Sequence, residues 1–519
     1  MRHEPAGHTP LMPLKGRRLT AFGATSKLFF PHPKGRLMLS PPGRQPASPR
    51  RSWIVKTVSM KNRTTFGFCL TYFTCLLLLA VVSGRAAAQT LPEPDREQLL
   101  NGLKVLYWQR PGDANVLLRL RVHSGAAFDL AGKGGTMALL GDALFPDPAT
   151  REYVTEQLGG KLEVTTSFDG IDATLAGKEG DFERLVDLLR GAVVTTQLTP
   201  EIVARIRDAR LKQLSEKSGS AAQTADRAIA ARIFGNFPYG HPAGGTVESV
   251  TKIDRADLML ARERFLNADN ATLVVIGGVG KLRVLRTLRQ LLGPWQKADR
   301  VVPATFRQPA APDARILVLN QANAPAAEIR LAIRGLARSD RDALAASLLS
   351  QIIRARWQAA MPDLSSVFVR HEPRGLPGSF ELGASAPTAS ASKAITAARQ
   401  ILQALIQTGP TVGELESTRA EALAEINKQT SQTESVAGIW LDVETFKLTA
   451  TSAQASSMGS LTIADMQRVA TRLFKDAAVA TVVVGDSEQL KTSLGANVEL
   501  PNERPMKTAI EPAMPTKKP

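Results

Sequence analysis

The chain has 519 residues, and 44% of them are hydrophobic, so it is long enough for two or three domains with substantial cores. Its formal net charge is +17, but residues 1–88 hold 14 of the 65 Lys and Arg side chains and only one acidic residue, Glu4, of 48. The remainder carries 51 basic and 47 acidic side chains, a net charge of +4. This balance does not support a nucleic-acid-binding protein.

Residues 60–88 have the pattern of a signal peptide. A short basic segment at residues 60–63 precedes an apolar run at residues 66–82, and small residues follow at 86–88. We expect cleavage near Ala88 and export to a bacterial periplasm, which would leave no stable membrane span. The alternative is an inner-membrane anchor formed by residues 66–82, a run of 17 residues that is marginal for a span.

The segment before this pattern, residues 1–59, is rich in Arg and Pro and nearly free of acidic residues. We interpret it as a start codon called too early, with Met60 as the true first residue, or as a disordered leader. Both cysteines, Cys69 and Cys75, lie in the apolar run. The exported form would therefore contain no thiol and no disulfide.

Downstream of residue 88, strand and helix periodicities are mixed. Strands predicted in hairpins, with helices collected in blocks, indicate an α+β fold. In the first part of the chain we predict strands at residues 103–108 and 115–122, helices around 136–144 and 151–158, a hairpin of residues 162–167 and 171–176, helices at 182–194 and 200–216, and a strand at 273–276.

Two elements recur later in the same order at an offset near 210 residues, which predicts an internal duplication. The strand Ala-Thr-Leu-Val-Val-Ile-Gly at residues 271–277 recurs as Ala-Thr-Val-Val-Val-Gly at 480–485. A helix with one pattern of Thr, Arg and apolar positions occurs twice, at Thr199, Arg207, Leu211 and Leu214 and again at Thr411, Arg419, Leu423 and Ile426.

Proline spacing suggests the boundaries of the duplicated units. Pro303, Pro309 and Pro312 punctuate a stretch with little periodicity, which predicts a linker. The expected organisation is a first unit at residues 89–300, a linker at 301–315, a second unit at 316–499 and a disordered tail at 500–519.

Residues 134–145, Gly-Gly-Thr-Met-Ala-Leu-Leu-Gly-Asp-Ala-Leu-Phe, are the most informative stretch of the chain. They resemble the zinc-binding helix of the M16 metallopeptidases (the pitrilysin/insulinase family, which includes the mitochondrial processing peptidase), where His-x-x-Glu-His stands between similar flanks. Residues 101–105, 124–129 and 237–242 are also similar to the family pattern. The resemblance implies two homologous α/β sandwich domains, with antiparallel sheets and helical layers, forming one half of a clam-shaped chamber.

The resemblance places the two zinc-binding histidines at Ala138 and Asp142 and the catalytic glutamate at Gly141. Residues four apart on a helix share one face, so two imidazoles there can meet one zinc while the glutamate takes a proton from zinc-bound water. The family's third ligand, a glutamate on a later helix, falls on Gln213. The resemblance therefore implies a homologue without catalytic residues and without bound zinc.

An active zinc site with unusual ligands, such as Asp142 and Glu216, is the alternative interpretation. Asp142 offers one oxygen ligand, and Glu216 would replace Gln213 if the helix register were shifted. After residue 90 the histidines are His123, His241 and His371, and no two of them are three or four residues apart. They therefore do not form a helical ligand pair.

Active family members also hold substrate through a C-terminal Arg and Tyr, in a segment that ends Gly-Leu-Ala-Tyr. The matching segment here is Asp-Leu-Ser-Ser at residues 363–366, which places Ser366 at the tyrosine position. Arg354 and Arg356 lie upstream and are candidates to contact a peptide carbonyl. The alternative is that both are surface arginines of a helix.

The combined prediction is an exported, catalytically inactive M16 homologue that forms a heterodimer with an active M16 subunit. The zinc would then be in the partner, and this chain would contribute chamber wall and binding of a peptide or unfolded protein at a strand edge. Two alternatives stay open: an active zinc metalloendopeptidase with non-standard ligands, and a peptide-binding scaffold of the cell envelope with no peptidase partner.

Overall fold

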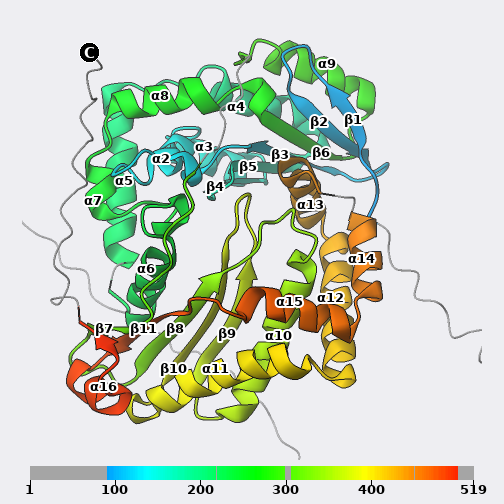
Figure 1. Ribbon diagram of the computed structural model, residues 1–519. Helices are drawn as coiled ribbons and strands as arrows, with labels where there is room; N and C mark the ends of the chain where they lie inside the picture. The colour runs from blue at the N-terminus through cyan, green and yellow to red at the C-terminus, as the bar shows by residue number, and fades with distance from the viewer. Residues whose placement is uncertain (1–90, 218, 299–305, 449–450, 501–519) are drawn as a thin grey trace, which may run out of the picture. The chain divides into compact units, whose positions relative to one another are not determined.

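The computed structural model describes residues 91–217, 219–298, 306–448 and 451–500 (Figure 1). The predicted signal peptide, the residues before it and nearly all of the predicted tail lie outside these ranges. Within them, no helix combines the length and the hydrophobicity that crossing a membrane requires.

The first half of the described chain forms a six-stranded sheet. Its strands occur in the order β1-β2-β6-β3-β5-β4, and all neighbours are antiparallel except β2 and β6, which are parallel. The strands are β1 (Asp95–Gln98), β2 (Lys104–Gln109), β3 (Asn115–Val122), β4 (Lys161–Thr166), β5 (Ile171–Lys178) and β6 (Ala271–Gly277).

The second half repeats this arrangement. Its sheet has the order β12-β7-β11-β8-β10-β9, and β7 is parallel to both β11 and β12. The strands are β7 (Ile316–Asn320), β8 (Ala327–Arg334), β9 (Ser365–Glu372), β10 (Ser379–Ala386), β11 (Ala480–Gly485) and β12 (Val498–Glu499).

The α+β class and the duplication are confirmed by this topology. The two strands whose sequences recur, β6 and β11, occupy equivalent places, each between a parallel and an antiparallel neighbour. The expectation of antiparallel sheets needs one correction, because both sheets are mixed. Each repeated strand returns after a long block of helices, so no tight hairpin fixes its direction relative to β2 or β7.

The helices follow the same duplicated order in both halves. In the first half they are α2 (Thr136–Asp142), α3 (Pro148–Glu152), α4 (Phe182–Val193), α5 (Pro200–Lys217), α6 (Ala221–Phe234), α7 (Val247–Thr251), α8 (Arg255–Phe265) and α9 (Lys281–Leu292). In the second half they are α10 (Ala343–Ala360), α11 (Ala391–Thr408), α12 (Val412–Ser431), α13 (Thr433–Phe446), α14 (Thr451–Ser460), α15 (Ile463–Phe474) and α16 (Ser487–Leu494).

The helix predicted at residues 151–158 has a different form from the one expected. It is the end of α3 followed by a π-helical turn, Tyr153–Gln157. Short 3-10 turns complete the structure at Ala126–Phe128, Glu179–Asp181, Pro238–Gly240, Ala268–Asn270 and Thr388–Ser390.

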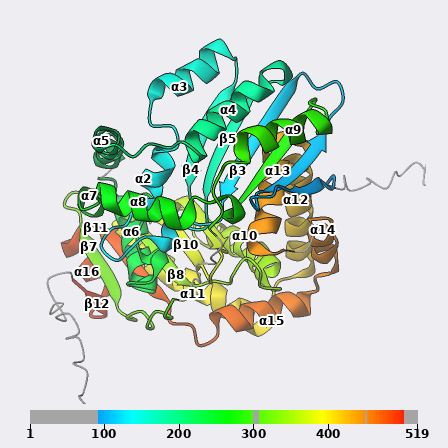
Figure 2. The same ribbon diagram turned by 90° about the horizontal axis from the view of Figure 1, so that it is seen from above.

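Each sheet has its own helical layer and a hydrophobic core beneath it. In the first half, apolar side chains of α2, α4, α8 and α9 pack on the sheet, and α4 lies beside α9 (Figure 2). In the second half, α10, α11 and α15 cover the sheet in the same way. These two layers account for one face of each sheet.

The other face of each sheet is covered by a helix from the opposite half. Successive residues of a strand point to opposite faces, and β6 follows this rule: Leu273 and Val275 join the core of the first half, while Val274 and Ile276 pack against α13. Reciprocally, Ile229 and Ile233 of α6 lie with Val482 and Val484 of β11, and α6 runs along β11 and β8 (Figure 1). This exchange joins the two halves through buried apolar surface.

Ion pairs reinforce the exchange. The Arg330 guanidinium of β8, whose side chain is 4% exposed, lies 2.6 Å from a carboxylate oxygen of Asp226 on α6. In the first half, Arg121 of β3 lies 2.7 Å from Asp442 on α13 and also pairs with Asp172 at 2.6 Å. A buried charge is costly unless it is paired, so these contacts fix where α6 and α13 dock.

Candidate functional site

Helix α2 begins at a tightly constrained turn. Its first flanking residue, Gly135, has a φ of 98°, which favours glycine. The Asp129 carboxylate accepts hydrogen bonds from the backbone N–H groups of Gly135 (2.6 Å) and Met137 (2.8 Å). These bonds satisfy donors that would otherwise have no partner at the start of the helix, and so hold α2 in place.

The two small residues on α2 lie where the helix packs closely. Ala138 is 1% exposed. A Cβ atom on Gly141 would lie 2.6 Å from Oγ1 of Thr166 on β4, closer than real Cβ contacts occur. The glutamate that the resemblance places at this position therefore cannot fit unless the Thr166 side chain or its surroundings shift. At the position of the catalytic glutamate, Gly141 has no side chain that could act as a base.

Asp142, the one polar residue at the three motif positions, is held by an arginine. Arg210 of α5 donates from Nη2 to Oδ1 (2.7 Å) and from Nε to Oδ2 (2.9 Å), a two-point contact in the fork geometry that arginine favours. The same Nη2 lies 3.4 Å from the carbonyl oxygen of Ala138. Burial raises the pKa of Asp142, and the charge and hydrogen bonds of Arg210 act in the opposite direction.

A cavity of about 320 Å³ lies between α2, α5, β4 and the start of α3, and we call it the α2–α5 cavity. The structure brings Gly141, Asp142 and Gln213 together at its wall, while Glu216 is exposed and is not among the lining residues. The lining residues are Gly141, Asp142, Phe145, Pro146, Pro148, Arg151, Val164, Arg205, Ile206, Ala209, Arg210 and Gln213.

The residues at the α2–α5 cavity do not fit a zinc ion. Catalytic zinc takes three protein ligands from His, Asp, Glu or Cys, whereas the carboxylate of Asp142 is engaged by Arg210 and Gln213 is a neutral amide. Throughout the part of the chain that the structure describes, no group of three or more His, Cys, Asp and Glu residues could hold a metal ion. The arginine side chain supplies the positive charge here.

Two histidines have structural partners elsewhere. The ring nitrogens of His123 lie 2.8 Å from Thr272 Oγ1 and 3.0 Å from Thr445 Oγ1, and Nε2 of His371 accepts a hydrogen bond from the Leu336 N–H at 3.1 Å. Burial lowers the pKa of both histidines to about 4. Both rings are therefore neutral near pH 7.

The three candidate substrate residues lie in the second half and do not line the α2–α5 cavity. Arg354 is exposed on α10, and Ser366 is exposed at the start of the edge strand β9, where its φ is 51°. Arg356 contacts the carboxylate of Glu414 at 2.6 and 2.8 Å, next to the first turn of α12. Its guanidinium would have to leave this pair to contact a peptide.

Arg210 is the important residue that sequence reasoning missed. The family resemblance directs attention to metal ligands on this helix, and Gln213 is the position that it assigns. The spacing nevertheless held a signal, because Arg210 lies three residues before Gln213 and therefore on the same face of α5, and both line the cavity. What the sequence could not show was that Asp142, 68 residues earlier, meets Arg210.

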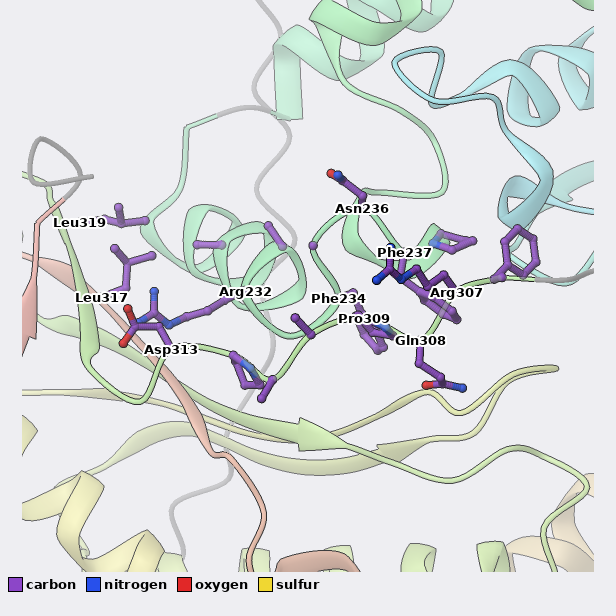
Figure 3. A pocket seen from close by; sticks show the side chains of 18 residues that line it. Arg232, Phe234, Asn236, Phe237, Arg307, Gln308, Pro309, Asp313, Leu317 and Leu319 are labelled. Carbon is purple, nitrogen blue, oxygen red and sulfur yellow. The ribbon is translucent and has the colours of Figure 1, made fainter. Parts of the chain in front are cut away.

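A larger cavity of about 760 Å³ lies between α6, residues 306–313 and β7 (Figure 3). The aromatic rings of Phe237 and Phe306 line it and lie 5.9 Å apart. At its other end the Arg232 side chain points toward Asp313, at 3.7 Å, and lies 2.9 Å from Glu499 of β12 (Figure 3). These contacts link α6 to the edge of the second sheet, and none of the residues predicted for a functional site is among them.

Comparisons with known proteins agree with this architecture. The family model of the peptidase M16 inactive domain matches residues 252–422. Subunit 1 of the human mitochondrial cytochrome b-c1 complex is 24% identical over 224 residues, which is 42% of this chain and 46% of that protein. An uncharacterized zinc protease of Mycobacterium leprae is 24% identical over 203 residues, which is 38% of this chain and 46% of that protein.

This chain spans about half the length of the curated relatives that it matches. Among solved structures, a protease from Helicobacter pylori matches with a TM-score of 0.71 at 17% identity, covering 76% of this chain and 100% of that one. That likeness supports the two-sheet fold. The family model and the curated relatives show that this chain is similar to proteins of the M16 peptidase family.

Proposed function

We propose that this protein is a catalytically inactive M16 homologue that acts as the non-catalytic partner of a zinc-containing M16 peptidase. The proposal rests on the residues of α2 and on their contacts. Ala138 and Gly141 offer no ligand or base, a Cβ at Gly141 would collide with Thr166, and Arg210 holds both oxygens of Asp142. A chain with this helix would take part in zinc-dependent peptide hydrolysis only together with another subunit.

Membership of a larger assembly is supported by one relative. The human protein that matches this chain is, by its name, a subunit of the cytochrome b-c1 complex. In the assembly that we propose, this chain contributes chamber wall and binds extended peptide or unfolded protein at an edge strand. Strand β4 is suitable because it ends the first sheet and its Val164 lines the α2–α5 cavity.

For its location, we propose export to the periplasm through the signal-like residues 60–88, with residues 66–82 as a membrane anchor if that segment is retained. The intact mass of the mature protein distinguishes the two forms. A polypeptide that begins near Gln89 supports export with cleavage, and one that includes residues 66–82 supports an anchor.

A second candidate, an active zinc peptidase, is favoured by the relatives that carry the name zinc protease. It would need ligands other than those that the α2–α5 cavity presents, because Asp142 is paired with Arg210 and Glu216 does not line the cavity. Metal analysis of the purified protein separates the two candidates.

The test of the partner role is affinity purification of the tagged protein from its native host, at native expression level and after mild cross-linking. We expect an M16 protein with an intact His-x-x-Glu-His motif to co-purify and to be absent from a control purification of an unrelated tagged protein from the same compartment. Recovery of envelope proteins without any such M16 subunit would contradict the proposal and support the scaffold alternative.

A further inference from the structure

We propose that the α2–α5 cavity is a binding pocket for a carboxylate group of an extended polypeptide. The position that holds a zinc cation in catalytic M16 helices has become, in this chain, a site where fixed arginines attract an anion. This inference rests on the proposed function, and it specifies which kind of peptide the non-catalytic subunit would hold.

The α2–α5 cavity is lined by more positive than negative side chains. Three arginines line the cavity, Arg151, Arg205 and Arg210, and Asp142 is the one carboxylate among the described residues that line it. Arg210 already satisfies both oxygens of Asp142, so this pair is neutral as a unit. Arg151 and Arg205 are exposed at the wall and leave an excess of positive charge that the cavity does not balance itself.

The arginines are placed to act together. Arg205 and Arg210 both come from α5 and line the cavity, together with Ile206, Ala209 and Gln213 of the same helix. Arg151 comes from α3 on the other side, and its Nε lies 3.4 Å from the carbonyl oxygen of Leu162 in β4, which fixes it beside the strand. A planar guanidinium recognises a carboxylate through paired N–H donors, so cations approaching from two sides favour that group.

The size and the lining of the α2–α5 cavity suit a single acidic residue. A cavity of about 320 Å³ holds a side chain or a terminal residue but not a folded segment. Phe145, Val164 and Ile206 give it apolar walls next to the cations. This combination suits the methylene stem and carboxylate of an acidic residue, because apolar walls reduce the solvent screening of the charge.

An extended peptide can reach the α2–α5 cavity along the edge strand β4. Strand β4 pairs with β5 and with no other strand that the structure describes, so beyond the Leu162 carbonyl, which Arg151 contacts, its outer edge is available for a further strand. Val164 and Thr166 face α2, whereas the intervening side chains alternate away from it. A peptide added along β4 would therefore present every second side chain toward the cavity.

The ligand can come from two sources with the same chemistry: an Asp or Glu side chain within a peptide, or a free C-terminal carboxylate. We would measure fluorescence anisotropy of the purified protein with labelled peptides of one alternating Val/Thr sequence. Three amidated versions carry a central Glu, Gln or Lys, and a fourth carries Gln with a free C-terminal acid. The Glu and free-acid peptides distinguish the two sources.

We expect at least one carboxylate peptide to bind about tenfold or more tightly than the amidated Gln peptide, because charge-assisted contacts to arginine are roughly twice as strong as neutral ones. The Arg151→Gln/Arg205→Gln double variant should lose this preference. Both side chains are exposed, so the variant is expected to fold. The matched control, Arg286→Gln on the exposed face of α9, should retain the preference.

Equal binding of the Glu, Gln and free-acid peptides, a preference for Lys, or an unchanged preference in the double variant would each overturn the proposal. Absence of binding to all four peptides would overturn it as well. The zinc content of the same preparation is measured separately. Failure of the carboxylate pocket, with zinc absent, is thereby distinguishable from failure of the non-catalytic assignment.

Discussion

At the scale of single residues, the close packing of α2 against β4 depends on Gly141. The Cβ that Gly141 lacks would meet Thr166 Oγ1 at 2.6 Å, so β4 can lie directly against α2. That approach brings Val164 to the same cavity as Arg210. The same glycine therefore offers no side chain for catalysis and allows the close approach of helix and strand.

We predict that Gly141→Ala destabilises the protein by about 1–3 kcal/mol, because overpacking a tight contact forces backbone shifts. Gly191→Ala in α4 is the matched control, since its Cβ would meet nothing within 4 Å. That change should be neutral or stabilising by about 0.5–1 kcal/mol through higher helix propensity. Urea unfolding at pH 7 measures both free energies. Equal stability of Gly141→Ala and the wild type would show that a side chain fits at this position.

At the scale of elements, the exchanged helices make the two halves depend on each other. The α13 helix follows α12 in the second half, yet its Trp440 is 3% exposed and lies against the first sheet. The Trp440 ring is edge-to-face with Trp108 of β2, with ring centroids 6.1 Å apart. Removing a buried side chain from α13 should therefore destabilise the sheet of the other half.

We predict that Trp440→Ala costs about 3–5 kcal/mol of unfolding free energy, since it deletes a large buried ring. Hydrogen exchange should show lost amide protection in β6, although the substitution is in the second half. Val412→Ala on α12 is the control, because Val412 is 64% exposed and a surface change of this kind stays within about 0.5 kcal/mol. Faster exchange confined to the helices of the second half would contradict the proposed coupling.

At the scale of the whole molecule, local patterns predicted much of the architecture. The alternation in residues 115–122 gave β3 with the bounds that the structure has, and the turn at Asp169-Gly170 joins β4 to β5. The recurring strand sequences identified β6 and β11 as equivalent. These features depend on residues close in sequence or on similarity between two segments. Both kinds of pattern can be recognised in the sequence alone.

Other features depend on contacts that local patterns do not encode. The periodicity of α6 and α13 shows that each has an apolar face, but not that this face covers the sheet of the opposite half. The parallel direction of β2 and β6 follows from a long helical connection. At the site, the motif positions Ala138, Gly141 and Asp142 could be identified from the sequence, whereas the pairing of Asp142 with Arg210 required the fold.

In the function that we propose, α2 holds no metal ion. The most direct test of this claim is the zinc content of the purified protein after incubation with excess zinc and desalting, read together with chelator-sensitive peptide cleavage. We predict zinc well below one ion per chain, no such cleavage, and no change on Asp142→Ala. One zinc per chain that is lost on Asp142→Ala, with cleavage that a chelator abolishes and no contaminating protease, would contradict the claim.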